Sequence, residues 1–576
     1  MALLLIQERW KNKMKVIIVG GVAGGATAAA RIRRLDEHAE ITVFERSGYI
    51  SYANCGLPYY IGDVITDPEE LTLQTPESFF KRFRINMKIH HEVISIHPDR
   101  KTVSVKNLEN GEIFEENYDK LILSPGAKPT QPRLPGVDID KLFTLRTVED
   151  TFRIKEYINK NHPKSAVLAG GGFIGLELAE NLRELGMDVT IVQRPKQLMN
   201  PFDPDMASMI HNEMRKHGIK LVLGYTVEGF KEKDNGVEVL LKDNPSLQAD
   251  MVVLAIGVTP DTALAKEAGL ELGIKGSIVV NDRMETSVPD IYAAGDAVQV
   301  KHYVTGDDAL ISLAGPANKQ GRIIADNICG GDSRYLGSQG SSVIKVFDMT
   351  AATTGINETN AKKSGLDIDT VILSPMSHAG YYPGGKVMTM KVVFEKETYR
   401  LLGAQIIGYE GVDKRIDVLA TAIHAGLKAT QLKDLDLAYA PPYSSAKDPV
   451  NMAGFMIDNI AKGTLKQWHL EDMDKISKDK SVVLLDVRTV GEFNRGHMDG
   501  FKNIPVDELR ERINEIEKGK PVYLICQSGL RSYIASRILE GNGYETYNFS
   551  GGFRFYDAVV NDRALIERSY ACGMDY

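Results

Sequence analysis

Short apolar runs alternate with helix-forming segments along most of the chain. An apolar run, a glycine turn, a helix and a second apolar run form a βαβ unit, which opens a doubly wound parallel sheet. That order occurs twice, at Lys15–Val19, Ala26–Leu35 and Ile41–Phe44 and again at Ser165–Ala169, Phe173–Leu185 and Asp188–Val192. The pattern therefore predicts two nucleotide-binding domains in tandem.

The second half of the chain has a different pattern. Residues from about 341 to 460 predict strands and helices without a glycine fingerprint. After Thr464 we expect strands at 482–485, 522–525 and 545–549 and helices at 507–517 and 532–539. The chain is thus expected to hold two tandem Rossmann-like dinucleotide-binding domains, an α+β domain and a C-terminal α/β domain. The boundaries are expected at 14–150 with 275–335, at 151–274, at 336–460 and at 466–570, after an extension of residues 1–13.

Composition narrows the class of protein. The 576 residues suggest about four domains, and 43% hydrophobic with 25% charged residues is ordinary for a globular protein. The net charge of −8 without a basic face argues against nucleic acid. No apolar run approaches the roughly 20 residues that span a bilayer. Four cysteines exclude a disulfide scaffold and fit a reducing compartment, so we expect a cytoplasmic protein without a metal site.

The first glycine loop, Gly20-Gly-Val-Ala-Gly-Gly25, stands between a strand and a helix. Backbone amides at a helix N-terminus can hold a pyrophosphate. Glu45 ends the next strand, where a carboxylate can accept from both ribose hydroxyls of an adenosine. Val22 replaces the middle glycine of the usual G-x-G-x-x-G pattern. We still predict dinucleotide binding by Gly20, Gly25 and Glu45.

The second glycine loop fits the same pattern fully, with Gly170, Gly172 and Gly175. Its strand ends at Gln193 followed by Arg194, where an acid would favour NADH and an arginine could meet a 2′-phosphate. We predict nicotinamide dinucleotide binding and leave NADH and NADPH open.

Three further segments connect these loops. Asn281–Ala297 contains a short strand followed by Asp296, and glycines stand in the segments Leu123–Pro129 (Gly126) and Ala255–Asp261 (Gly257). In this order the motifs resemble the two-dinucleotide flavoprotein disulfide reductases over residues 15–455. The resemblance implies FAD in the first domain with Asp296 as a contact, NAD(P)H in the second, crossover strands at Gly126 and Gly257, and a dimerisation domain that makes a homodimer.

The first notable cysteine lies in Ser51-Tyr-Ala-Asn-Cys-Gly-Leu-Pro58. Most reductases of that superfamily carry a second cysteine five positions later, but Tyr60 stands there. Cys55 must therefore form a sulfenic acid, a mixed disulfide or a persulfide rather than an internal disulfide.

A closer resemblance decides among these products. The Cys55 segment, His378–Pro383, Gly411–Asp417, Ala438–Ser444 and Lys447-Asp448 resemble the coenzyme A-disulfide reductases. This resemblance implies a mixed disulfide of Cys55 with coenzyme A, assisted by Tyr381 and Tyr439 of the partner subunit. It also implies coenzyme A contacts from Thr27, Arg31, Arg34, Ser51, Asn54 and Lys447. Two positions differ from residues that can occur in the family: Arg31 stands where a glutamine can occur, and Phe83 stands where a lysine can occur. Arg82 and Arg84 could substitute for that lysine as contacts of the coenzyme A phosphates.

The second notable cysteine, Cys526, follows an apolar run and opens a loop before a helix. Such a loop is a nest of inward amides that favours a thiolate, and Arg531 adds positive charge. Its C-x4-R spacing is one residue shorter than phosphatase-like loops and suits a persulfide. Residues 466–565 resemble the rhodanese family, in which Asp486 with Arg488 and His497 are expected to be structural. Cys329 and Cys572 are expected to have no chemical role.

Together these patterns predict an NAD(P)H-dependent flavoprotein that reduces coenzyme A persulfide or polysulfide at Cys55, with sulfane sulfur relayed by Cys526. The alternatives are coenzyme A-disulfide reduction with an independent rhodanese, an NADH oxidase or peroxidase, and a rhodanese domain that only docks a partner. Whether coenzyme A stays bound or exchanges as a substrate is left open.

Overall fold

The computed structural model describes residues 13–234 and 236–571. Nearly all of the expected extension at 1–13, and Cys572, lie outside the described residues. The chain divides into two compact units, one of residues up to Arg194 with Tyr225–Gly340, and one of Pro195–Gly224 with residues from Ser341 onward. Each unit is described separately. The predicted α/β class with Rossmann-type domains is confirmed.

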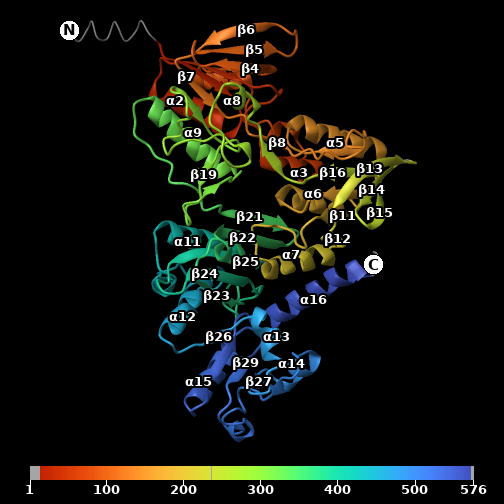
Figure 1. Cartoon of the computed structure of the whole chain (residues 1–576), viewed down its shortest axis with the longest axis vertical. Coiled ribbons are helices and arrows are strands. Elements are labelled where there is room, and N and C mark those ends of the chain that lie inside the picture. The colour runs from red at the N-terminus through yellow and green to blue at the C-terminus, as the bar shows by residue number, and fades with distance from the viewer. Residues whose placement is uncertain (1–12, 235, 572–576) are drawn as a thin grey trace, which may run out of the picture. The chain divides into compact units, whose positions relative to one another are not determined.

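The first unit begins with a parallel sheet in the order β18-β7-β1-β2-β3. Its connecting helix α2 (Ala23–Leu35) packs along α9 (Ala314–Ile328), as Figure 1 shows. A Cβ atom added at Gly321 of α9 would lie 2.3 Å from the Gly24 carbonyl oxygen, so glycine permits this close approach. The strands are β18 (Ile291–Ala293), β7 (Lys120–Leu123), β1 (Lys15–Val19), β2 (Glu40–Phe44) and β3 (Asn86–Lys88).

A second parallel sheet in this unit contains strands in the order β11-β10-β16-β9. Helix α6 (Phe173–Glu184) connects β10 to β11, and α5 (Val148–Asn161) follows β9. The predicted crossover strands pair antiparallel with each other as β8 (Ala127–Pro129) and β17 (Val258–Pro260). The sheet strands are β11 (Asp188–Gln193), β10 (Ser165–Ala169), β16 (Met251–Leu254) and β9 (Leu142–Thr144).

Small elements complete the first unit. Two antiparallel three-stranded sheets have the orders β4-β5-β6 and β13-β14-β15. Their bounds, with those of the short helices, are β4 (His91–His97), β5 (Thr102–Asn107), β6 (Ile113–Asn117), β13 (Val227–Lys233), β14 (Gly236–Leu241), β15 (Asn244–Ala249), α3 (Leu57–Ile61), α4 (Pro76–Phe83) and α8 (Ala263–Glu267).

The second unit is built on an antiparallel sheet in the order β21-β22-β25-β24-β23. Segment 195–224, which we expected within 151–274, belongs to this unit through α7 (Pro204–Lys216) and β12 (Lys220–Leu223). The other elements are β21 (Ser342–Val346), β22 (Met349–Gly355), β23 (Ile368–Leu373), β24 (Thr389–Glu395), β25 (Leu401–Gly408), α10 (Glu358–Lys363), α11 (Val412–His424) and α12 (Pro449–Ala461). The domain boundaries themselves stay predictions.

The C-terminal part of this unit is a parallel sheet in the order β26-β30-β29-β27-β28, with Trp468 buried against Phe549. Strands lie close to the predicted 482–485, 522–525 and 545–549, and a helix covers the predicted 532–539. Its elements are β26 (Gln467–Trp468), β27 (Val483–Asp486), β28 (Lys502–Asn503), β29 (Val522–Ile525), β30 (Thr546–Phe549), α13 (Met473–Ile476), α14 (Val490–Arg495), α15 (Leu530–Glu540) and α16 (Gly552–Ala571).

One expected helix is wrong. Residues 507–517 form turns and a single 3-10 turn at Ile513–Glu515 rather than an α-helix. The buried side chains of Leu509 and Ile516 anchor the segment in the core. The Tyr544 hydroxyl lies 3.3 Å from the Ile513 carbonyl oxygen and 3.1 Å from that of Ile516. Tertiary contacts thus overrode a helix-forming composition.

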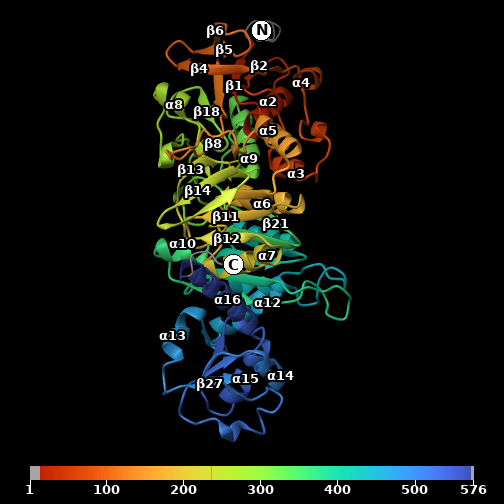
Figure 2. The same ribbon diagram turned by 90° about the vertical axis from the view of Figure 1, so that its right-hand side faces the viewer.

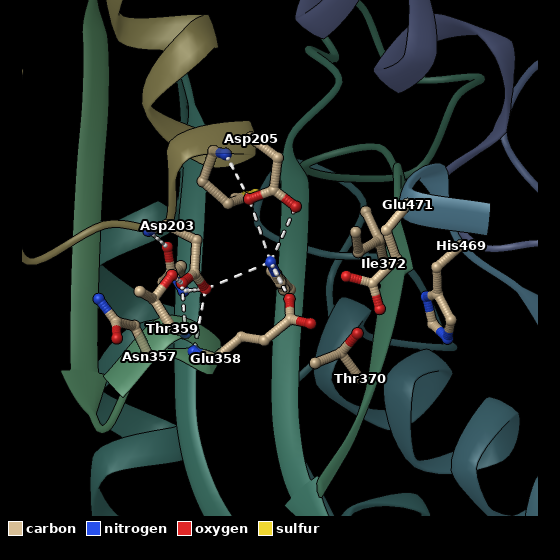
Figure 3. Close-up of polar contacts among 12 residues, drawn as sticks. Asp203, Asp205, Asn357, Glu358, Thr359, Thr370, Ile372, His469 and Glu471 are labelled. Atoms are coloured by element: carbon tan, nitrogen blue, oxygen red, sulfur yellow. Dashed lines mark hydrogen bonds and ion pairs between the residues drawn. The ribbon is translucent and has the colours of Figure 1, made fainter. Parts of the chain in front are cut away.

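A buried lysine joins α7 to the antiparallel sheet. Lys391 on β24 is 1% exposed, and its Nζ lies 3.2 Å from Asp203, 2.8 Å from Asp205 and 2.6 Å from Glu358. Figure 3 shows the three carboxylates converging on one nitrogen. Burial opposes ionisation of Asp203, but Lys391 and hydrogen bonds from Thr359 hold its pKa below the ordinary value. Because an unpaired buried charge is costly, these groups fix α7 on the sheet.

The C-terminal domain is attached to the same sheet by its first strand. The Gln467 amide donates to Asp369 (3.0 Å) and to the Thr370 carbonyl oxygen (2.7 Å). His469, drawn in Figure 3, lies 3.2 Å from Asp369, and Lys362 pairs with Glu471. Hydrogen bonds and ion pairs therefore join the start of this domain to the antiparallel sheet.

Helix α16 makes a second attachment, to α7, and the two helices lie side by side in Figures 1 and 2. The Leu198 N–H donates to His211 Nε2 (2.9 Å), so the ring donates through Nδ1 to Asp562 (2.8 Å). Arg215 donates to the other oxygen of Asp562 at 2.5 Å. Burial opposes ionisation of Asp562, but the hydrogen bonds from His211 and Arg215, with the charge of Arg215, hold its pKa below the ordinary value.

We predict that Asp562→Ala destabilises this unit by about 3 kcal/mol, because it leaves Arg215 without its carboxylate. Thermal unfolding of the full chain should show a lower midpoint at neutral pH. Since the folded pKa of Asp562 is depressed, its contribution is full above about pH 4 and is lost as the pH falls through the folded value. Glu545→Gln, which breaks the exposed Lys466–Glu545 pair, is the control and should cost at most about 1 kcal/mol. Equal midpoints for the two variants would contradict the prediction.

Candidate functional site

Both predicted dinucleotide loops have the geometry that a pyrophosphate requires. Gly20 (φ +97°) and Gly170 (φ +120°) turn the chain where a Cβ would lie 2.1 Å and 2.2 Å from a carbonyl oxygen of a neighbouring strand end. The helices that follow, α2 and α6, begin without a side-chain cap. Their first N–H groups are therefore available to an anion.

The two loops differ at the middle position of the pattern. A Cβ added at Gly172 would meet no atom within 4 Å, which leaves space for a ligand close to the backbone. The corresponding residue of the first loop is Val22, which already carries a side chain at the N-cap of α2. The second loop thus fits a dinucleotide fully, and the first fits one with less room at this point.

The strand-end residues bind the glycine loops. Glu45 is buried, and its carboxylate accepts from the Gly21 N–H (2.8 Å) and the Ser47 N–H (2.9 Å). Gln193 does the same in the second domain, accepting from the Gly171 N–H at 3.1 Å, while Arg194 is exposed. Each side chain fixes its loop at the edge where a ribose would lie. Gly257 lines a cavity of about 530 Å³ with Ile256, Lys275 and other residues of the first unit.

Cys55 is exposed at the start of α3, in the 3-10 turn Asn54–Gly56. Burial of its sulfur and the carboxylate of Glu177 raise the pKa of the thiol, and Arg146 acts against them. Burial and the neighbouring Glu180 raise the pKa of Glu177 itself to about 7. A hydrogen bond between Tyr59 and Glu177 joins α3 to α6. Charges from several elements therefore control the state of Cys55.

Arg146 was not singled out from the sequence, but it lies at the centre of this region. Its Nε donates to the Ala127 carbonyl oxygen (3.0 Å) and its Nη2 to Asp296 (3.1 Å). The Asn54 amide makes two hydrogen bonds with Arg146 when its oxygen faces the guanidinium. Arg146 Nη1 then donates to the Asn54 oxygen (2.9 Å), and the Asn54 nitrogen donates to the Arg146 carbonyl oxygen (3.1 Å). The flanking Gly126 adopts φ +70° and lies against the guanidinium. Asp296 and Asn54 are thus tied to one cation.

The residues expected to contact coenzyme A lie in different settings. Arg31 pairs with Asp326 (2.8 Å), and the Thr27 hydroxyl donates to Asn318 (2.5 Å). Arg34 and Lys447 are exposed. Ser51 adopts φ +44° and donates its N–H to the Gly21 carbonyl oxygen (2.8 Å). These assignments stay predictions. Among the three cations of this set, an ion pair in the described structure involves Arg31.

Tyr381 and Tyr439, both in the second unit, form a pair. Their hydroxyl oxygens lie 2.7 Å apart, although the residues are 76% and 46% exposed. The hydrogen bond with Tyr381 raises the pKa of Tyr439. Two exposed hydroxyls joined in this way form a ready donor for an external group.

Cys526 directly follows β29 and is 1% exposed. Its sulfur accepts from the Gly529 N–H at 3.1 Å and lies 3.2 Å from the Ser532 hydroxyl. That hydroxyl also lies 3.1 Å from the Gly529 carbonyl oxygen, and its single proton serves one acceptor at a time. A negative charge on sulfur would draw the proton to itself, since hydrogen bonds to ions are stronger.

Arg531, expected to charge this loop, is itself neutralised. It donates to both oxygens of Glu492 at 2.7 and 2.8 Å, and these bonds lower the pKa of Glu492 to about 2. Glu492 was not singled out as a partner of Arg531 from the sequence. Asp486 and Arg488 form the expected buried ion pair (2.6 Å), with the guanidinium over the Phe553 ring. Cys329 caps α9 as expected.

Two Rossmann-type sheets with glycine loops, the exposed Cys55 and the buried Cys526 that accepts a backbone N–H indicate an oxidoreductase with a second cysteine-bearing domain. Family models for pyridine nucleotide-disulphide oxidoreductases match residues 14–321, those for the dimerisation domain of this family match 341–449, and those for rhodanese-like domains match 469–558. The chain belongs to the pyridine nucleotide-disulphide oxidoreductase family and carries a rhodanese-like domain. Membership of this family implies FAD and NAD(P)H.

Three relatives are particularly similar. The coenzyme A disulfide reductase of Staphylococcus aureus is 39% identical over 77% of this chain and 99% of its own. The crystal structure of reduced Bacillus anthracis CoADR-RHD is 48% identical, with a TM-score of 0.93 over 96% of this chain and 99% of that chain. The NAD-dependent persulfide reductase from A. fulgidus is 39% identical, with a TM-score of 0.88 over 94% and 100%. Among the described residues, no helix is long and apolar enough to span a membrane.

We predict that Ser532→Ala slows sulfur transfer at Cys526 about tenfold, because a hydrogen bond to a charged group contributes roughly 1.5–3 kcal/mol. The measurement is transfer of sulfane sulfur from thiosulfate to cyanide by the full chain. Ser536→Ala is the matched control, since that hydroxyl bonds the Tyr533 carbonyl oxygen one turn later on the same helix. An equal loss in both variants would show that helix stability, not the sulfur contact, is responsible.

Proposed function

We propose that the protein reduces coenzyme A persulfide or polysulfide, and coenzyme A disulfide, with NAD(P)H at the single redox residue Cys55, and that Cys526 relays sulfane sulfur to this reaction. The observation that carries the proposal is the presence of two differently built cysteine sites in one chain. Cys55 is exposed, and Tyr60 occupies the position of a second cysteine. Cys526 is buried under inward donors that suit a bound sulfane sulfur.

The bond changes follow from this arrangement. The Cys55 thiolate attacks the coenzyme A-bound sulfur of the persulfide, the sulfur–sulfur bond breaks, and hydrosulfide leaves. A mixed disulfide between Cys55 and coenzyme A remains. FAD, when bound, supplies the two electrons from NAD(P)H that convert this disulfide to two thiols. The net reaction takes the persulfide, NAD(P)H and a proton to coenzyme A, hydrogen sulfide and NAD(P)⁺.

Other side chains can bind the phosphates of coenzyme A and protonate its leaving thiolate. Coenzyme A carries phosphates, for which exposed Arg34 and Lys447 are suitable partners. Its thiolate leaves most easily when a hydroxyl protonates it, and the hydrogen-bonded pair Tyr381 and Tyr439 can do so. By resemblance these tyrosines act on the partner subunit of a homodimer.

A second candidate is coenzyme A-disulfide reduction with an independent rhodanese. The S. aureus relative supports it, since nearly its whole length aligns with 77% of this chain.

The test is anaerobic oxidation of NADH and of NADPH by the purified protein with coenzyme A persulfide or coenzyme A disulfide. Faster turnover with the persulfide, released sulfide and loss of both in Cys55→Ser are expected. Cys526→Ser should abolish turnover only when sulfur is supplied as thiosulfate. Faster turnover with the disulfide, unaffected by Cys526→Ser under every condition, would establish the second candidate.

We predict that Tyr381→Phe and Tyr439→Phe each slow coenzyme A-disulfide reduction, and that the double variant is scarcely slower than either single one. The two hydroxyls act as one donor when they share a hydrogen bond, so their effects should not add. Steady-state kcat is the measurement, with Tyr443→Phe as an exposed control in the same segment. Fully additive losses would indicate two independent roles.

A further inference from the structure

The Cys55 sulfur lies among charges of both signs. Glu177 on α6 and Asp296 after β18 both raise the pKa of the thiol, as does burial, and Arg146 lowers it. Tyr59 and Glu180 complete the titratable groups that face this region from α3 and α6. With two carboxylates against one guanidinium, the charge of Arg146 decides whether a thiolate can persist, and only the thiolate is nucleophilic.

The geometry gives Arg146 a defined position relative to these groups. Its ion pair with Asp296 (3.1 Å) cancels one of the two carboxylates. Its reciprocal hydrogen bonds with Asn54 (2.9 and 3.1 Å) reach the residue directly before Cys55. The pair is shielded, with side chains only 22% and 19% exposed, so water screens it weakly.

The backbone of Arg146 is fixed as firmly as its side chain. Its N–H donates to Asp150 (2.9 Å), which belongs to the capping box of α5 with Thr147. The Tyr52 hydroxyl donates to its carbonyl oxygen (3.4 Å). The backbone of Arg146 is therefore fixed at the start of α5, and from there its guanidinium reaches Asn54 and Asp296.

We propose that Arg146 is a positioning residue for Cys55: it holds the cysteine loop through Asn54 and offsets the charge of Asp296, so that the sulfur loses its proton more readily than it would without the guanidinium. The proposal rests on Cys55 being the reacting sulfur and not on the identity of the substrate. Arginine suits the task because three separate acceptors are served by one planar group, which a lysine cannot do.

The test is the pH dependence of Cys55 alkylation in the reduced holoenzyme, followed by mass spectrometry of the Cys55 peptide. Arg146→Met should raise the pH of half-maximal alkylation by about one and slow the reaction near pH 7 about tenfold. Arg146→Gln keeps hydrogen-bond donors but removes the charge, so it should also raise the pH of half-maximal alkylation. This variant provides the test if Arg146→Met does not fold. Arg146→Lys should bring the midpoint back toward that of the unaltered protein.

Two further variants separate charge from general damage. Glu177→Gln should shift the midpoint in the opposite direction, because it removes a carboxylate that faces Cys55. Arg153→Met should leave the midpoint unchanged, since Arg153 on α5 donates to the Leu142 carbonyl oxygen and stacks on Phe143. Unchanged midpoints in both Arg146→Met and Arg146→Gln, or a Lys variant no better than Met, would overturn the proposal. Neither result depends on whether coenzyme A persulfide is the substrate.

Discussion

Backbone N–H groups at uncapped helix starts are the interaction on which the candidate sites depend. Helices α2, α6 and α15 each follow a parallel strand and a tight turn, and none has a capping side chain. Such orphan donors need a partner, and an anion is the best one. In the first two cases the open positions suit a pyrophosphate. In the third the Cys526 sulfur itself accepts from the Gly529 N–H. One local construction therefore serves both the cofactors and the sulfur.

The two cysteines reach reactivity in different ways. Cys526 is shielded from water and depends on hydrogen bonds, since the nearby guanidinium of Arg531 is already paired with Glu492. Cys55 is exposed and depends on a balance of charges in which burial and Glu177 raise its pKa. A buried sulfur held by donors suits storage of a small sulfane atom, whereas an exposed one suits attack on a large substrate. This contrast supports the proposal that Cys526 holds sulfane sulfur and Cys55 attacks the substrate.

Sequence patterns predicted the elements that depend on local chemistry and missed those that depend on tertiary contacts. Strands β1, β10 and β29 have the predicted bounds, because apolar runs before glycine or cysteine loops are strong local signals. The helix expected at 507–517 failed because Tyr544, distant in sequence, bonds two of its carbonyl oxygens. Arg146 was missed for the same reason, since its partners Asn54 and Asp296 are 92 and 150 positions away. Long-range ion pairs leave no periodic pattern in a sequence.

The buried charges of the second unit bear on why the rhodanese-like domain is part of this chain. His211 and Arg215 lie on α7, in a segment whose sequence follows the second dinucleotide fold, yet their shared carboxylate, Asp562, comes from α16. The opposite end of α7 is fixed by Lys391 through Asp203 and Asp205. A chain cut before residue 466 would lose Asp562 together with the face of α16 that covers His211 and Arg215, so α7 would lose this attachment. The C-terminal domain is thus a structural part of the unit as well as a second sulfur site, and the two roles cannot be separated by simple truncation.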